Sequence, residues 1–195
     1  MAETSLSLLD RLQDSPQNEA WARLVEIYTP LMRAWLKRQG LADAAADDLV
    51  QEVLTVVLRR VPEFEHNGRT GAFRTWLRTI TANCLRDFWR SKRMRPLAGG
   101  EGAFDQWLQE LADSDSGLSR LWDQEHDQHV TRKLLEMLQP RFTPNTWQAF
   151  CRVAIDAQKP EAVAQELGLT VNAVFVAKSR VLAALRQEAA GLIDL

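Results

Sequence analysis

Apolar residues recur at intervals of three and four along most of this chain, and this spacing constrains the fold more than any other feature of the sequence. The N-terminal half contains three such segments, and none shows the alternation of apolar and polar residues that is typical of strands. Each is therefore predicted to form an amphipathic helix. The segments are residues 18–38 (NEAWARLVEIYTPLMRAWLKR), 43–60 (DAAADDLVQEVLTVVLRR) and 72–92.

The C-terminal part repeats this spacing in segments that proline and glycine separate. Four more helices are predicted here, over residues 122–138, 144–156, 160–167 and 171–190. Between the two groups, residues 97–119 are rich in glycine, serine and acidic residues, which is the composition of a linker, although the sequence FDQWLQEL can form a short helix. We therefore expect an all-α protein of two small helical domains, residues 1–96 and 125–195, joined by a flexible acidic linker over residues 97–124.

Composition excludes several classes of protein. The 195 residues, 46% of them hydrophobic, are enough to bury one or two ordinary cores. The two cysteines, Cys84 and Cys151, lie outside any C-x-x-C pair and indicate neither a disulfide framework nor a zinc site. The sequence has no signal-peptide pattern at its start and no apolar run of the ~18 residues that span a membrane. We expect a soluble cytoplasmic protein without membrane insertion and without a cofactor.

The net charge of −2 conceals a strong asymmetry along the chain. Residues 59–95 contain 10 Lys and Arg against 3 Asp and Glu, a net charge of +7, whereas residues 96–127 contain 1 against 8, a net charge of −7. A basic block of this density is the electrostatic footprint expected of a segment that binds a polyanion. The alternative is a helix face on which these cations are only solvated.

The basic block falls largely on the predicted helix 72–92, whose residues divide into faces at 100° per residue. The apolar face is predicted to form a core stripe, in which Cys84 is buried and unreactive: Phe73, Leu77, Ile80, Cys84 and Phe88. A second side carries Thr79, Asn83, Arg86, Arg90 and Arg93, with Trp76 at its border and Arg74, Arg78 and Lys92 farther round.

The polar side of this helix is predicted to bind single-stranded nucleic acid. Cations follow phosphates, aromatic rings stack on bases, and an amide such as that of Asn83 can hydrogen-bond a base edge. For Trp76 and Trp89 the choice between a base platform and a core residue stays open, because tryptophans in helices are usually buried.

A second motif lies in KPEAVAQELGLTVNAVFVAKSRVLAALRQ, residues 159–187. A short helix, a tight turn at Gly168 and Thr170 as the N-cap of a longer helix together predict a helix-turn-helix. The longer helix is predicted to bury Val174, Val181 and Leu185 and to present Asn172, Val176, Ser179, Arg180 and Ala183 to the major groove of duplex DNA. A plain helical hairpin without a DNA role is the alternative.

Three segments together carry a family resemblance: DDLVQEVLTVVLRRVPEF, FRTWLRTITANCLRDFWRSKR and, after an acidic linker, EAVAQELGLTVNAVFVAKSRVLAALR. They resemble an extracytoplasmic-function (ECF) sigma factor of the bacterial sigma-70 family, particularly the type abundant in planctomycetes. The resemblance covers residues 18–96 and 125–190. It implies a non-catalytic initiation factor that binds core RNA polymerase, recognises promoter DNA and melts it. An anti-sigma factor or other inhibitor is a further expected partner.

The resemblance also implies residue roles. Asp48, Leu49, Gln51 and Glu52 match the segment with which the family docks on the clamp helices of the polymerase's largest subunit. Asn83 aligns with a family asparagine near the pocket for a flipped-out base of the minus-ten element, with the loop 64–71 as the opposite wall. Minus-ten contacts are expected from Arg74, Trp76, Arg78, Asn83, Arg86, Arg90, Lys92 and Arg93, and minus-thirty-five contacts from Asn172, Phe175, Val176, Lys178, Ser179 and Arg180.

Two features depart from the family pattern. The loop FEHNGRTGAF, residues 64–73, is longer than its equivalent in well-known members, so the base pocket can differ in geometry and preference. Phe175 and Val176 stand where family members often have Arg and Ser. Contacts with the minus-thirty-five element should therefore include fewer hydrogen bonds and can instead involve thymine methyl groups.

Other classes of function compete with a sigma factor. A one-component helix-turn-helix regulator would act without core polymerase, but it would not need the basic aromatic helix or the DDLVQE face. An enzyme is disfavoured because the sequence has no P-loop, no G-x-S-x-G and no paired Cys-His site. His126 and His129 are three residues apart on a predicted helix, but without a third ligand nearby we expect surface residues and assign no metal.

Overall fold

The computed structural model describes residues 7–14, 19–65, 71–92, 106–107, 109–113 and 115–193, with only the backbone at Lys92. Every regular element in these residues is a helix, which confirms the all-α prediction. No single helix in these ranges is long and apolar enough to cross a membrane, and the pair Pro160–Leu167 and Val171–Ala189, bent by 104°, meets the criterion only when its two helices are taken together.

The N-terminal part is formed by α1 (Leu8–Asp14), α2 (Glu19–Arg38), α3 (Asp43–Arg60) and α4 (Ala72–Lys92), with a 3-10 turn (Val61–Glu63) after α3. The three long helices lie where their periodicity predicts them, whereas α1 is an addition. Its sequence signal is a capping box, in which the Ser7 backbone N–H donates to Asp10 Oδ2 (3.0 Å) and the Asp10 N–H donates to Ser7 Oγ (3.1 Å).

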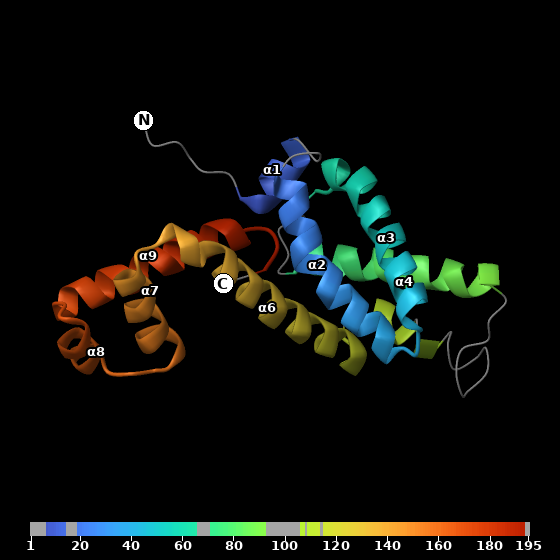
Figure 1. Cartoon of the computed structure of the whole chain (residues 1–195). Helices are drawn as coiled ribbons and strands as arrows, with labels where there is room; N and C mark the ends of the chain where they lie inside the picture. Colours follow the sequence, from blue (N-terminus) through green and yellow to red (C-terminus); the bar gives the residue numbers. More distant parts are fainter. Residues whose placement is uncertain are drawn as a thin grey trace.

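These helices pack through the faces on which their apolar residues recur. Within the bundle α2 contacts α3, α3 contacts α4, and α1 contacts α2 and the turn after α3 (Figure 1). Ile27, Trp35, Leu49, Val53 and Phe73 are each at most 2% exposed. Burying a large apolar side chain contributes ~1.5–3 kcal/mol, so these shared faces are the main stabilising contacts of the bundle.

The C-terminal part is formed by α6 (Gly117–Leu138), a 3-10 turn (Gln139–Arg141), α7 (Pro144–Phe150), a π-helical turn (Cys151–Ile155), α8 (Pro160–Leu167) and α9 (Val171–Ala189). The single helix predicted over residues 144–156 is thus α7 plus the π-helical turn. α7, α8 and α9 contact one another and share a small core of Ala149, Val163, Ala164, Val174 and Ala177.

α6 begins inside the interval predicted to be a flexible linker. Its first residues are capped by Ser116, whose Oγ accepts a hydrogen bond from the Ser119 N–H (3.0 Å). Trp122 is 2% exposed and meets the Trp35 ring edge-on, with the ring centroids 4.8 Å apart. The linker prediction is therefore wrong for residues 117–124, because an aromatic contact fixes them on α2. Within that interval, residues 97–105, 108 and 114 lie outside the described residues.

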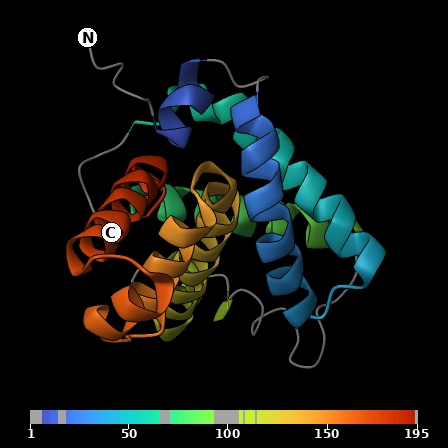
Figure 2. The same ribbon diagram turned by 60° about the vertical axis from the view of Figure 1, so that its left-hand side comes forward.

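α6 also connects the two parts of the chain, since it contacts α2, α4 and α9 (Figures 1 and 2). The main core continues through Trp122, Val130, Leu134 and Leu138 of this helix to the end of α9 and the residues after it, Leu185, Ala189, Leu192 and Ile193. Gly191 follows α9 with φ +81°, and a Cβ there would lie 2.7 Å from Leu9 Cδ2. Only glycine allows the chain after α9 to pass this close to α1.

Candidate nucleic-acid interface

The buried face of α4 is the predicted core stripe. Phe73, Leu77, Ile80, Cys84 and Phe88 are all at most 8% exposed, which confirms that prediction. Burial, followed by the negative charges of Glu52 and Asp87, raises the pKa of the Cys84 thiol to about 11. Cys84 is therefore a protonated and poorly nucleophilic packing residue.

The opposite face of α4 is open and polar. Asn83 and Arg90 are exposed, and Arg86 is half-buried. The Asn83 Oδ1 accepts a hydrogen bond from Arg86 Nη1 at 2.8 Å, so the amide NH2 of Asn83 points its donors elsewhere. This face presents amide donors and guanidinium groups together, as the sequence predicts. Arg93 and the side chain of Lys92 lie outside the described residues.

The two tryptophans of α4 are only half-buried. Trp76 lies against Phe64 and Phe73, with centroid distances of 5.1 and 5.4 Å. Trp89 meets Phe88 edge-on at 5.9 Å. Both rings therefore pack on the core with one side and keep part of their surface in solvent. Each ring is thus partly a core residue and partly accessible for stacking on a base.

Arg74 and Arg78 point toward α6 and away from the open face of α4. Arg78 is 2% exposed, and its Nη1 lies 2.8 Å from Asp123 Oδ1 and 3.5 Å from the carbonyl oxygen of Ser119. Arg74 Nη1 lies 2.7 Å from Asp127 Oδ2, and its Nε lies 3.3 Å from Asp123 Oδ2. The expectation that both arginines are available to DNA is wrong in this arrangement, because α6 covers their flank of the helix.

The sequence analysis did not predict that Asp123 and Asp127 form ion pairs with arginines of α4. Both lie within the acidic segment 96–127, whose net charge of −7 balances the +7 of residues 59–95. The equal and opposite net charges of the two segments were a sequence feature that could have indicated ion pairs between them. Net charges do not show, however, which individual side chains form a pair. Arg78 and Asp123 are 45 residues apart in sequence.

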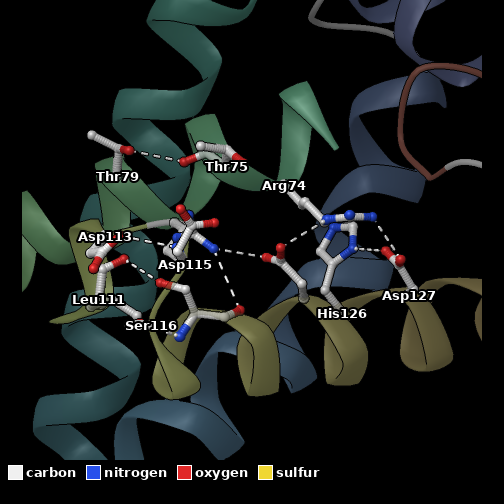
Figure 3. A network of polar contacts seen from close by, with 12 residues as sticks. Arg74, Thr75, Thr79, Leu111, Asp113, Asp115, Ser116, His126 and Asp127 are labelled. Carbon is white, nitrogen blue, oxygen red and sulfur yellow. Dashed lines mark hydrogen bonds and ion pairs between the residues drawn. The ribbon is translucent and has the colours of Figure 1, made fainter. Parts of the chain in front are cut away.

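His126 is not a surface residue, whereas His129 is only partly covered. His126 is fully buried, where its Nδ1–H donates to Asp127 Oδ1 (2.9 Å) and its Nε2 accepts from the Tyr28 hydroxyl (3.0 Å). Figure 3 shows Arg74 and His126 converging on Asp127. Burial lowers the pKa of His126 and raises that of Tyr28, so both rings are neutral at pH 7. His129 is half-buried, and its Nε2–H donates to the Ile27 carbonyl (2.7 Å).

α3 presents two kinds of acidic residue. Those facing α2 are held in ion pairs, Lys37–Asp43 and Arg33–Asp47, each at 2.6 Å. Asp48, Gln51 and Glu52 are exposed, and within the described part of the chain Asp48 and Glu52 have no ion-pair partner. Leu49 is fully buried and packs beneath that surface, so its side chain supports the exposed residues of the segment from the core side.

The helix-turn-helix is formed as its residues predict. The Thr170 side chain caps α9 by accepting from the Ala173 N–H at 3.1 Å, and Gly168 ends α8 at φ +64°. The Leu169 N–H donates to the Ala164 carbonyl (2.8 Å), which closes the turn. Val174 is fully buried in the small core, so the face of α9 opposite to it is free to meet another molecule.

The free face of α9 is partly apolar. Phe175 is 51% exposed and Val176 is 40% exposed, and both are large hydrophobic side chains in solvent. Asn172, Ser179 and Arg180 are exposed around them, and Lys178 is half-buried. A helix of this size fits the major groove, where apolar groups can contact thymine methyls and Arg180 can contact phosphate or guanine.

Comparisons with known proteins match one family model and two relatives. Residues 24–95 match the family model for sigma-70 region 2. The chain is 31% identical over 90 residues to the ECF RNA polymerase sigma factor BldN of Streptomyces coelicolor, covering 46% of this chain and 33% of that protein. It is 30% identical over 145 residues to the probable RNA polymerase sigma factor RfaY of Xanthomonas campestris pv. campestris, covering 74% of this chain and 34% of that protein. The chain thus spans about a third of the length of these relatives.

The region 2 match extends from within α2 through α4, so this bundle is similar to sigma-70 region 2. The two relatives are themselves named as RNA polymerase sigma factors.

Proposed function

We propose that this chain is an RNA polymerase sigma factor of the ECF type, which binds core polymerase, recognises promoter DNA and opens it. One observation carries the proposal: a sigma-70 region 2 match over residues 24–95 occurs in the same chain as a helix-turn-helix whose recognition helix has an open face. The region 2 part carries groups that can bind melted DNA, and the helix-turn-helix can bind duplex DNA. The protein itself catalyses no step.

The proposed polymerase contact is the outer face of α3. Asp48, Gln51 and Glu52 offer carboxylate and amide groups to a basic helix, such as a clamp helix of the largest polymerase subunit. Their exposure supports this assignment, as does the lack of an ion-pair partner for Asp48 and Glu52 in the described residues. Neighbouring Asp47 is already paired with Arg33, so it is less suited to the role.

The proposed minus-ten contact is the open face of α4. Asn83 would hold a base that leaves the stack on melting, while Arg86 and Arg90 contact the phosphates of the same strand. Asn83 can donate its amide NH2 to the base while its Oδ1 keeps the hydrogen bond from Arg86, and the remaining guanidinium N–H groups of Arg86 can contact phosphate. The opposite wall of the base pocket includes residues 66–70, which lie outside the described residues.

The proposed minus-thirty-five contact is the open face of α9. Phe175 and Val176 would touch thymine methyl groups, and Asn172, Ser179 and Arg180 would contact base edges or phosphates. The proposal extends to the planctomycete type, to action in the cytoplasm and to restraint by an anti-sigma factor or another inhibitor, all of which the sequence motifs imply.

Run-off transcription tests the proposed function. Core polymerase from the source bacterium is supplied with genomic fragments, with and without the full chain. Specific starts that need the chain are the expected result. Tight DNA binding by the chain alone, with no added initiation by core polymerase, would instead establish a one-component regulator.

A further inference from the structure

One carboxylate interrupts the basic open face of α4. Asp87 is exposed, and it follows Asn83 by one turn of the helix, between Arg86 and Arg90 in the sequence. Within the described residues Asp87 forms no ion pair, although two arginines are this close along the chain. A carboxylate repels phosphate, so it weakens binding to a nucleic-acid backbone. On this face Asp87 can therefore contribute to binding only through a contact other than phosphate.

The side chains of the open face lie on two sides of a line through Asn83. At about 100° per residue, Arg86 and Arg90 are about 60° and about 20° to one side of Asn83, whereas Trp76 and Asp87 are about 20° and about 40° to the other side. The hydrogen bond that Arg86 Nη1 donates to Asn83 Oδ1 at 2.8 Å agrees with this division. Cations thus follow one edge of the face, and an aromatic ring and a carboxylate follow the other edge.

The edge that carries Asp87 is the border between α4 and α3. These two helices contact each other, and Cys84 of α4 is buried. The pKa of its thiol is raised first by burial and then by the negative charges of Glu52 and Asp87. A carboxylate from each helix therefore lies near the same thiol. Both carboxylates are exposed, so this border is open to solvent.

A single strand of DNA has a matching division, since its phosphates run along one edge and its bases project from the other. Arg86 and Arg90 match the phosphates, and the half-buried ring of Trp76 matches a base that stacks on it. Asp87 then lies on the side of the bases. Four residues of helix rise by about 6 Å, so Asp87 can contact the base next to the one that Asn83 is proposed to hold.

The chemistry of a carboxylate decides which base it favours. An ionised carboxylate only accepts hydrogen bonds, and the exocyclic N4 amino group of cytosine donates them. Thymine has the acceptor O4 at the corresponding position. Replacing cytosine by thymine therefore puts two acceptor oxygens opposite each other and turns an attraction into a repulsion.

We propose that Asp87 is a specificity-determining residue of the open face of α4, which accepts a hydrogen bond from the amino group of a cytosine in the melted strand and rejects thymine at that position. This inference rests on the proposed function, in which this face binds the melted minus-ten strand. The same carboxylate keeps phosphates on the side of Arg86 and Arg90, so it also sets which edge of the strand faces α3. Rejection of the wrong base contributes to specificity as much as acceptance of the right one.

The test uses the full chain without polymerase and two fluorescein-labelled single-stranded DNA homopolymers of equal length, oligo-dC and oligo-dT. A homopolymer places the same base at every position, so the register of binding does not matter. The natural chain should bind oligo-dC at least ~5-fold more tightly than oligo-dT, the low end expected of a specific base contact. Asp87→Asn should reduce this preference to about twofold or less, because an amide can both accept from cytosine and donate to thymine.

Two further variants serve as controls. Glu26 is exposed on α2, and Glu26→Gln removes the same charge away from the open face of α4. It should keep the cytosine preference and change the affinity for both homopolymers by no more than about twofold, as expected of net charge alone. Asp87→Glu keeps a carboxylate and should keep the preference. A natural chain without preference for oligo-dC, or the same preference in Asp87→Asn, would overturn the proposal.

Binding to core polymerase separates this inference from other roles of Asp87. If Asp87→Asn lowers the affinity for core polymerase and keeps the cytosine preference, Asp87 belongs with Glu52 to the polymerase contact and the proposal is wrong. Run-off transcription separates it from the proposed function. If the cytosine preference depends on Asp87 but the natural chain supports no specific starts, the proposed function is wrong and the base contact is retained.

Discussion

Trp122 tests whether the start of α6 is a packed element or a flexible linker. Replacing it with alanine removes a side chain that is 2% exposed and stands edge-on to Trp35 at 4.8 Å. A linker residue would tolerate this change at almost no cost. A core residue would not, because the surroundings collapse only partly into the space left by the indole.

The size of the effect follows from the surroundings of the ring. Tryptophan or phenylalanine to alanine in a core costs ~3–5 kcal/mol. Two effects reduce the loss here: the Trp122 Nε1 is buried with no hydrogen-bond partner among the described residues, and alanine favours the helix by a few tenths of a kcal/mol. We expect Trp122→Ala to lower the free energy of unfolding by about 3 kcal/mol. Trp122→Phe keeps a ring and should cost about 1 kcal/mol or less.

The measurement is urea unfolding at pH 7, followed by far-UV circular dichroism. Leu121→Ala is the matched control, because Leu121 is the preceding residue of the same helix and is 49% exposed. It should change the free energy of unfolding by roughly 0.5 kcal/mol at most. If Trp122→Ala costs no more than Leu121→Ala, the packing of α6 on α2 is wrong.

Three further predictions concern the proposed surfaces and the buried histidine. Asp48→Lys combined with Gln51→Ala should weaken core-polymerase binding by ~1–3 kcal/mol per contact. The circular dichroism spectrum should stay unchanged, because both side chains are exposed. If the variant and the natural chain compete equally well for core polymerase, these residues are not part of the interface. Asn83→Ala should reduce permanganate-reactive thymines but not duplex recruitment, whereas Arg180→Ala should weaken the closed complex; rescue of Asn83→Ala by a pre-melted template would exclude base holding. Burial lowers the pKa of His126, so the folded chain binds fewer protons than the unfolded chain, and the free energy of unfolding should fall as pH drops below about 6.5. The urea midpoint of the natural chain should therefore depend on pH in this range more strongly than that of His126→Gln. Parallel curves for the two proteins would refute this role of His126.

Local features of the sequence were enough to predict most of the secondary structure. Helix periodicity located α2, α3 and α4, and the Gly168 turn with the Thr170 cap located the helix-turn-helix. The core stripe from Phe73 to Phe88 followed from angle alone. These predictions succeed because the spacing of apolar residues and the capping groups act within a few residues of one another.

The tertiary structure decided which charged groups are available. Arg78 and Arg90 are the same residue type on the same helix, yet Arg78 is 2% exposed beneath α6 and Arg90 lies in solvent. Periodicity gives the direction of a side chain around its helix axis, but it does not say which element lies in that direction. The cover over Arg78 comes from Asp123, 45 residues along the chain, and is held there by Trp122 against Trp35. Contacts this distant depend on packing of the whole chain, so no local pattern specifies them.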